Sequence, residues 1–188
     1  ICLVAVLKLP IFHLTINDLR ITKDESARLF KLSLPIAGQN LIISMGGLVL
    51  QSVVNKQGFL FMTGYNAAGR MQGLMEMAGT ALRGAVGTFT GQNFGAGKMD
   101  RVKEGSQKAV VLAIFMASVI GGTVALLSKP LLSLFLQDEK EIVDQVLTYG
   151  SRYLTFMGVS LFALYLLFVF RSALQGLGDT VTSMFSGV

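Results

Sequence analysis

Charged side chains are scarce in this sequence. They make up 14% of its 188 residues, whereas an ordinary soluble domain carries about 25%. So little charge cannot cover a water-soluble globule of this size, and the mean hydropathy of +0.62 is correspondingly high. The scarcity excludes an ordinary soluble domain and indicates that much of the surface faces lipid. The bilayer is therefore the first partner that we expect.

Several kinds of site are also missing. The single cysteine, Cys2, excludes a disulfide within the chain, and a lone thiol lacks the spacing of a metal site. No apolar run carries the clustered carboxylates that a metal diphosphate needs, which disfavours a prenyl- or glycosyl-transferase. The sequence contains no motif that resembles the selectivity filter of a channel, which disfavours a channel subunit. We expect a protein that is not an enzyme and that holds neither metal nor cofactor.

The excess of positive charge, a formal net charge of +5, raises the question of nucleic acid. The basic residues lie between apolar runs, however, so an anionic membrane surface fits them better and we expect no nucleic-acid partner. Strands are excluded because no run alternates over the roughly 10 residues that a membrane barrel strand needs.

Apolar runs of membrane-spanning length fill most of the chain, and a helix needs about 20 such residues to cross a bilayer. The sequence therefore predicts an all-α transmembrane bundle. Lys129-Pro130 is expected to end the third full helix, with Leu131 to Leu136 lying along the membrane interface. The predicted segments are the end of a helix over 1–13, a cytoplasmic loop over 14–29, helices over about 30–54, 59–90, 106–128 and 141–171, and the start of another over 180–188.

The loops around 14–31 and 92–108 and the turn at 171–180 share one side of the membrane if the helices alternate. The positive-inside rule places this side in the cytoplasm and predicts a multi-pass protein of the plasma (inner) membrane. The chain lacks an initial Met and opens and stops inside apolar runs, which we interpret as a piece of a longer membrane protein. The basic residues of that side are Arg20, Lys23, Arg28, Lys31, Lys98, Arg101, Lys103, Lys108 and Arg171.

The segment 59–90 carries a polar stripe. At 100° per residue its polar and small residues fall within about 40° of one line, and such a stripe should face a cavity or another helix. The hypothesis for Glu76 is that it binds substrate cations or exchanges a proton; the alternative is a structural pair with Arg83 or with a neighbouring helix. The stripe comprises Gly69, Gln72, Glu76, Thr80, Arg83 and Gly87.

Amides mark the preceding uncharged run, from Leu32 to Asn55. Gln39, Asn40 and Gln51, together with Gln72, either line a substrate pathway or bond helix to helix, because both roles require the same inward orientation.

Gly91 to Gly97 reads Gly-Gln-Asn-Phe-Gly-Ala-Gly. Three glycines in seven residues make poor helix interior, so we predict a turn at the membrane surface. A P-loop is excluded, because Gln92 stands at its first glycine position and Met99 replaces the Ser or Thr.

This stretch, continued to Arg101, resembles a signature of the multidrug and toxic compound extrusion (MATE) transporters. Leu174-Gln-Gly-Leu-Gly-Asp-Thr180 is similar to a second turn of that family, and Leu34-Pro35 with Gln39-Asn40 resembles the first helix of a lobe. The residues that match the two turns are Gly91, Gln92, Asn93, Gly95, Ala96, Gly97, Arg101, Gln175, Gly176 and Gly178.

The resemblance implies most of the second six-helix lobe of a twelve-helix transporter, with the N-terminal lobe as its partner. It implies export of organic, often cationic compounds against an inward flow of protons or sodium ions. Sodium-dependent relatives carry an acidic residue in the seventh helix, whereas the corresponding run here, Leu32 to Asn55, has only amides. The coupling ion therefore stays open, and a lipid-linked oligosaccharide flippase of the same superfamily is the alternative.

Overall fold

The computed structural model describes residues 22–134 and 140–186 of the chain. Within these ranges every regular element is a helix, which confirms the all-α class. The segment 1–13 and the first half of the predicted loop, residues 14–21, lie outside the described residues. The helices are α2 (Lys23–Asn55), α3 (Phe59–Gly95), α4 (Met99–Ser133), α5 (Lys140–Gly176) and α6 (Thr180–Phe185).

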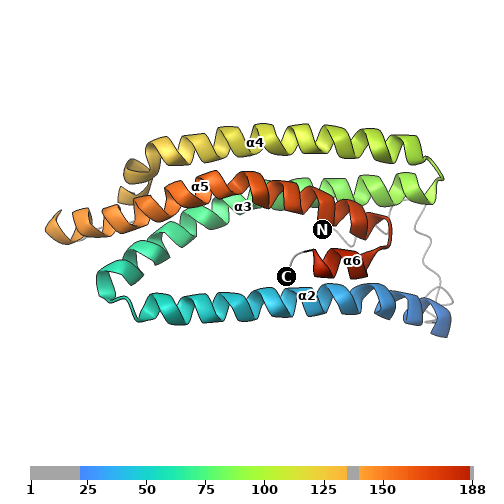
Figure 1. Cartoon of the computed structure of the whole chain (residues 1–188), viewed down its shortest axis with the longest axis horizontal. Coiled ribbons are helices and arrows are strands. Elements are labelled where there is room, and N and C mark those ends of the chain that lie inside the picture. Colours follow the sequence, from blue (N-terminus) through green and yellow to red (C-terminus); the bar gives the residue numbers. More distant parts are fainter. Residues whose placement is uncertain (1–21, 135–139, 187–188) are drawn as a thin grey trace, which may run out of the picture.

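Helices α3, α4 and α5 form the packed body of the molecule. Figure 1 shows α3 and α5 running side by side with α4 along one side of them, while α2 runs along the other. The short α6 lies between α5 and α2, and α2 makes more contacts with α6 than with α3. The described chain is therefore a three-helix core with α2 held mainly through α6.

Helices α3 and α5 are parallel along their whole length. Gly64 lies against Gly150 near the start of both helices. Gly91 faces the carbonyl of Gly176 near their ends. Two long helices in this register bring their carboxyl ends to the same end of the molecule.

Small residues let α4 approach α5 closely. Ala109, Ala113 and Ala117 recur every four residues on α4 and are buried. One turn further, a Cβ on Gly121 would overlap the backbone carbonyl of Gly158 on α5. Small residues at a crossing are what membrane helices use to bring backbones together, since lipid provides no hydrophobic drive between them.

The apolar outer surface is typical of a membrane protein. Helices α2 and α4, with Val143–Gly176 of α5, are long and apolar enough to cross a bilayer. Large apolar side chains such as Leu126, which is 84% exposed, point outward from them. Helix α3 does not meet this criterion because its charged and polar stripe lowers its hydropathy, although it is longer than a bilayer requires.

Helix α2 begins earlier than predicted. It starts at Lys23 rather than near residue 30, so the charged segment assigned to the loop over 14–29 is helical from there onward. Thr22 explains the difference: its hydroxyl accepts a hydrogen bond from the backbone N–H of Glu25 at 3.3 Å and caps the first turn. Asp24 and Glu25 in that turn add favourable charge at the helix N-terminus.

Helix α4 is kinked at Leu127, whose φ and ψ are −108° and 16°, three residues before Pro130. A break is thus present close to the predicted end at Lys129-Pro130, and the piece beyond it is helical as far as Ser133. Its position along the membrane interface stays a prediction. Pro130 accounts for the kink, because its ring cannot donate to the carbonyl four residues back and crowds it.

Candidate functional site

A chain of hydrogen bonds runs along the polar stripe of α3. The Tyr153 hydroxyl on α5 donates to Oε1 of Gln72 at 2.6 Å. Nε2 of Gln72 in turn donates to Oε1 of Glu76 at 2.7 Å. The amide therefore uses both of its ends, and the carboxylate of Glu76 is linked through it to the neighbouring helix.

Glu76 does not pair with Arg83. Among the residues that the structure describes, the ion pair is Glu104–Lys108, at 2.6 Å on the surface of α4. Glu76 and Arg83 are seven residues apart, a rise of about 10 Å along a helix, so their heads meet only if both side chains extend along the axis. The structural pair considered from the sequence is replaced by the shorter contact with Gln72, one turn away.

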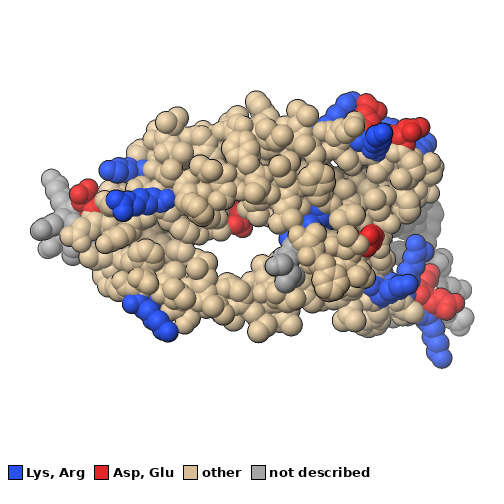
Figure 2. Space-filling model, viewed as in Figure 1, with Lys and Arg blue, Asp and Glu red and all other residues tan. Residues whose placement is uncertain are grey.

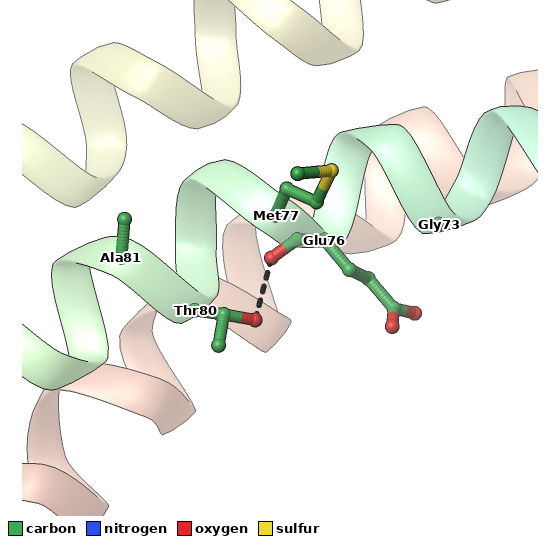
Figure 3. Close-up of a pocket in the computed structure, with 5 residues that line it drawn as sticks. All are labelled: Gly73, Glu76, Met77, Thr80 and Ala81. Carbon is green, nitrogen blue, oxygen red and sulfur yellow. Dashed lines mark hydrogen bonds between the residues drawn. The ribbon is translucent and has the colours of Figure 1, made fainter. Parts of the chain in front are cut away.

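The surroundings of Glu76 are small and open. Figure 3 shows its carboxylate pointing away from the helix, beside a depression of about 410 Å³ lined by Gly73, Met77, Thr80 and Ala81. The Thr80 hydroxyl donates to the backbone carbonyl of Glu76 at 2.8 Å and not to its carboxylate. One carboxylate oxygen thus accepts from Gln72, and a cationic group can approach the carboxylate without displacing a large neighbour.

An opening separates α2 from the three-helix core. Figure 2 shows this opening through the molecule, with acidic atoms at its edge and basic atoms nearby, while most of the remaining visible surface carries no charge. On the face in view, charged atoms away from the ends of the molecule therefore lie beside the opening.

The amides of α2 lie apart from this site. Gln39 is buried and donates to the carbonyls of Ser183 at 2.7 Å and Met184 at 3.3 Å, so it binds α2 to α6. Gln51 donates within its own helix, to Asn55 Oδ1 at 2.9 Å. Asn40 is exposed. The structure brings Gln72 and Glu76 together and gives Gln39 the helix-to-helix contact.

The first glycine motif contains the predicted turn between two helices, but the turn is shorter than the motif, because the preceding helix ends at Gly95 rather than near residue 90. Helix α3 runs to Gly95, and only the following three residues turn. Gly97 has a φ of 71°, and the Lys98 N–H donates to the carbonyl of Asn93 at 2.8 Å. This is the pattern of a Schellman cap, in which glycine takes the left-handed position. Packing of Gly91 against α5 offsets its poor helix propensity.

The second motif builds the same cap on α5. Gly178 has a φ of 85°, and the Asp179 N–H donates to the carbonyl of Leu174 at 3.0 Å. Gln175 donates to the Ser183 hydroxyl at 3.0 Å and holds α6 beneath the turn. Because α3 and α5 are parallel, both caps lie at one end of the bundle. Of the remaining matched positions, Gln92 and Ala96 are exposed, Arg101 is exposed on α4, and Gly176 is half-buried.

Two features of this region were not predicted from the sequence: the contact made by Tyr153 and the burial of Arg171. Tyr153 lies 81 residues from its partner, so no local spacing indicates the contact. Arg171, assigned to a cytoplasmic turn, is part of α5 and only 8% exposed. A basic residue near the end of an apolar run is typical of a side chain at the membrane surface, so the position of Arg171 in the sequence did not indicate burial.

Comparison with known proteins gives a consistent result. The sequence model of the MatE family matches residues 35–188. The chain is similar to the probable multidrug resistance protein YpnP of Bacillus subtilis (strain 168), with 29% identity over 139 residues, 73% of this chain and 31% of that protein. It is also similar to the probable multidrug resistance protein YoeA of the same organism, with 26% identity over 128 residues, 66% of this chain and 27% of that protein. The matched region thus spans less than a third of the length of either relative.

Proposed function

Because the chain belongs to the MatE family, we propose that it forms most of one lobe of a secondary active transporter that exports organic cations. The names of both relatives as probable multidrug resistance proteins support the export of drugs, and the cationic character of the substrate is proposed from Glu76. The transporter is proposed to span the plasma (inner) membrane several times and to use a proton or sodium gradient. No further cofactor is proposed.

The hydrogen-bonded chain from Tyr153 through Gln72 to Glu76 is the observation that carries the proposal. A carboxylate away from the helix ends is costly in a membrane and is retained where it meets water or a ligand. Glu76 has one amide donor and a depression beside it. It can therefore hold either an organic cation or a proton, and competition between the two couples export to proton entry.

The experiment is efflux of a fluorescent organic cation by cells that express the full-length transporter. We expect Glu76→Gln to reduce efflux to the background level, because the amide cannot hold a cation or exchange a proton. Asp144→Asn is the matched control, since Asp144 is an exposed carboxylate at the far end of α5. Normal efflux and normal pH dependence in Glu76→Gln would remove this residue from the mechanism.

The coupling ion is tested by imposing proton and sodium gradients separately. The seventh-helix equivalent, α2, carries amides but no carboxylate between residues 32 and 55. We propose proton coupling through Glu76, so efflux should follow the proton gradient and persist without sodium. Efflux that requires sodium and ignores pH would contradict this assignment.

A lipid-linked oligosaccharide flippase is the second candidate, and the arginines favour it. Arg171 is buried and Arg83 half-buried, on adjacent helices. Two guanidinium groups suit a diphosphate better than an organic cation. Translocation of a labelled lipid-linked sugar by proteoliposomes that fail to export cations would favour the flippase.

The remaining part of the transporter is the proposed partner of this chain. A central cavity between two lobes needs both of them. We therefore expect no efflux from cells that express residues 1–188 alone, and efflux from such cells would contradict the proposed one-lobe role.

A further inference from the structure

A groove between α3 and α4 lies apart from the Glu76 site. It encloses about 540 Å³ near the end where α3 finishes and α4 begins. Its floor is apolar and includes Leu82, Val86 and Phe89 of α3. Its rim on α4 carries Arg101 and Lys108. Figure 2 shows charged side chains gathered at this end of α4, on the outside of the bundle.

On its α4 side the groove is lined partly by small residues. The Phe89 ring lies so close to Gly105 that a Cβ there would overlap it, so the ring occupies the space beside this glycine. Ala109 lies one turn further along α4. The remaining space of about 540 Å³ is bordered by apolar side chains of α3, and an acyl chain can lie along them.

The charges of the rim favour an anion. Arg101 and Lys108 lie two turns apart on α4, with Glu104 between them. Glu104 pairs with Lys108 at 2.6 Å, but both side chains are more than half exposed, so this pair contributes little and is easily exchanged. Arg101 makes no ion pair within the described chain, and its guanidinium matches a phosphate in two-pronged geometry.

We propose that this groove binds an anionic phospholipid, with the phosphate at Arg101 and Lys108 and an acyl chain along the floor. Free phosphate would leave the apolar floor empty, and a zwitterionic lipid would gain less from the cationic rim. The rim lies at the start of α4, in the basic segment that the charge distribution places on the cytoplasmic side, where anionic lipids concentrate. Basic pockets between membrane helices on that side bind such headgroups. The proposal requires only membrane insertion and is independent of the transported substrate.

The test is lipid retention by the purified full-length protein. Phosphatidylglycerol is titrated into detergent-solubilised protein, and bound lipid is counted by native mass spectrometry with phosphatidylcholine as the reference. Near a membrane surface each Lys or Arg is worth about fivefold in binding, so Arg101→Gln with Lys108→Gln should lower phosphatidylglycerol retention roughly 30-fold. Retention of phosphatidylcholine should change little.

Two further variants separate this groove from general surface charge. Lys56→Gln with Lys129→Gln removes the same charge from exposed positions elsewhere, and it should retain phosphatidylglycerol like the wild type. Ala85→Phe fills the floor beside the intact rim and should also reduce retention. Equal losses in both double variants, equal retention of the two lipids by the wild type, or displacement of the lipid by inorganic phosphate at equal concentration would overturn the proposal.

Discussion

Tyr153 donates its hydroxyl hydrogen to Oε1 of Gln72 at 2.6 Å and thereby joins α5 to the polar stripe of α3. The contact orients the amide, whose Nε2 then points at Glu76. The Tyr153 ring also packs against Tyr65, with centroids 4.9 Å apart. A side chain from one helix thus fixes the hydrogen bonding of a carboxylate on another.

Replacing Tyr153 with Phe removes the donor and keeps the ring. Hydrogen bonds between membrane helices are worth about 0.6 kcal/mol on average, so the fold should survive with a small loss of stability. The freed amide can rotate and release Glu76, so we expect a shifted pH dependence of efflux by the full-length protein. Tyr149→Phe is the control, because Tyr149 lies one turn before Tyr153 on α5 and packs edge-on against Phe61. Identical pH profiles for the two variants would show that Tyr153 does not position Glu76.

Neighbouring glycines on α4 should respond in opposite ways to the same substitution. A Cβ on Gly121 would overlap the Gly158 carbonyl, whereas one on Gly122 meets nothing within 4 Å. Gly121→Ala should therefore destabilise the bundle by about 1–3 kcal/mol, the usual cost of overpacking. Gly122→Ala should be neutral or slightly stabilising. Thermal unfolding in detergent measures both, and equal melting temperatures would contradict the close crossing of α4 and α5.

The turn after α3 offers a second glycine pair. Gly97 has a φ of 71°, which costs an L-residue roughly 1–2 kcal/mol. Gly95 lies in helical geometry with no neighbour within 4 Å of an added Cβ. Gly97→Ala should lower the melting temperature in detergent while Gly95→Ala leaves it unchanged or raises it. A lower melting temperature for Gly95→Ala than for Gly97→Ala would mean that the motif is not capped at Gly97.

Asp179 predicts a dependence of stability on acid. The hydroxyl and backbone N–H of Thr182 act as donors to its carboxylate and hold its pKa below the ordinary value of 3.8. A carboxylate with a lowered pKa stabilises the fold fully above the unfolded value, and this contribution is lost as the pH falls through the folded pKa. Asp179→Asn keeps an acceptor oxygen but cannot titrate, so its stability should fall less steeply than that of the wild type below about pH 4. Parallel acid-unfolding curves would contradict the cap.

The features that depend on composition or on residues close together in the chain could be predicted from the sequence. Scarce charge implied lipid, and helical spacing placed Gln72 and Glu76 on one face. The features that depend on contacts with a distant segment of the chain could not be predicted in this way. Gly91 stays helical where it packs against Gly176 of α5, and the carbonyls of α6 decide which of the two roles left open for Gln39 it takes. Tyr153 carries no local sign of its partner, since the contact depends on the parallel register of two helices.

The central claim is that these helices cross a bilayer and turn the polar stripe of α3 toward water. The most direct measurement is labelling by a water-soluble maleimide of single-cysteine variants of the full-length transporter in membranes, with Cys2 and any other native cysteine replaced by Ser. Gln72→Cys and Glu76→Cys should react, and the substrate should protect them. Leu126→Cys, on the outer apolar face, should not react. Inert cysteines at 72 and 76, or equal labelling at all three positions, would contradict the account.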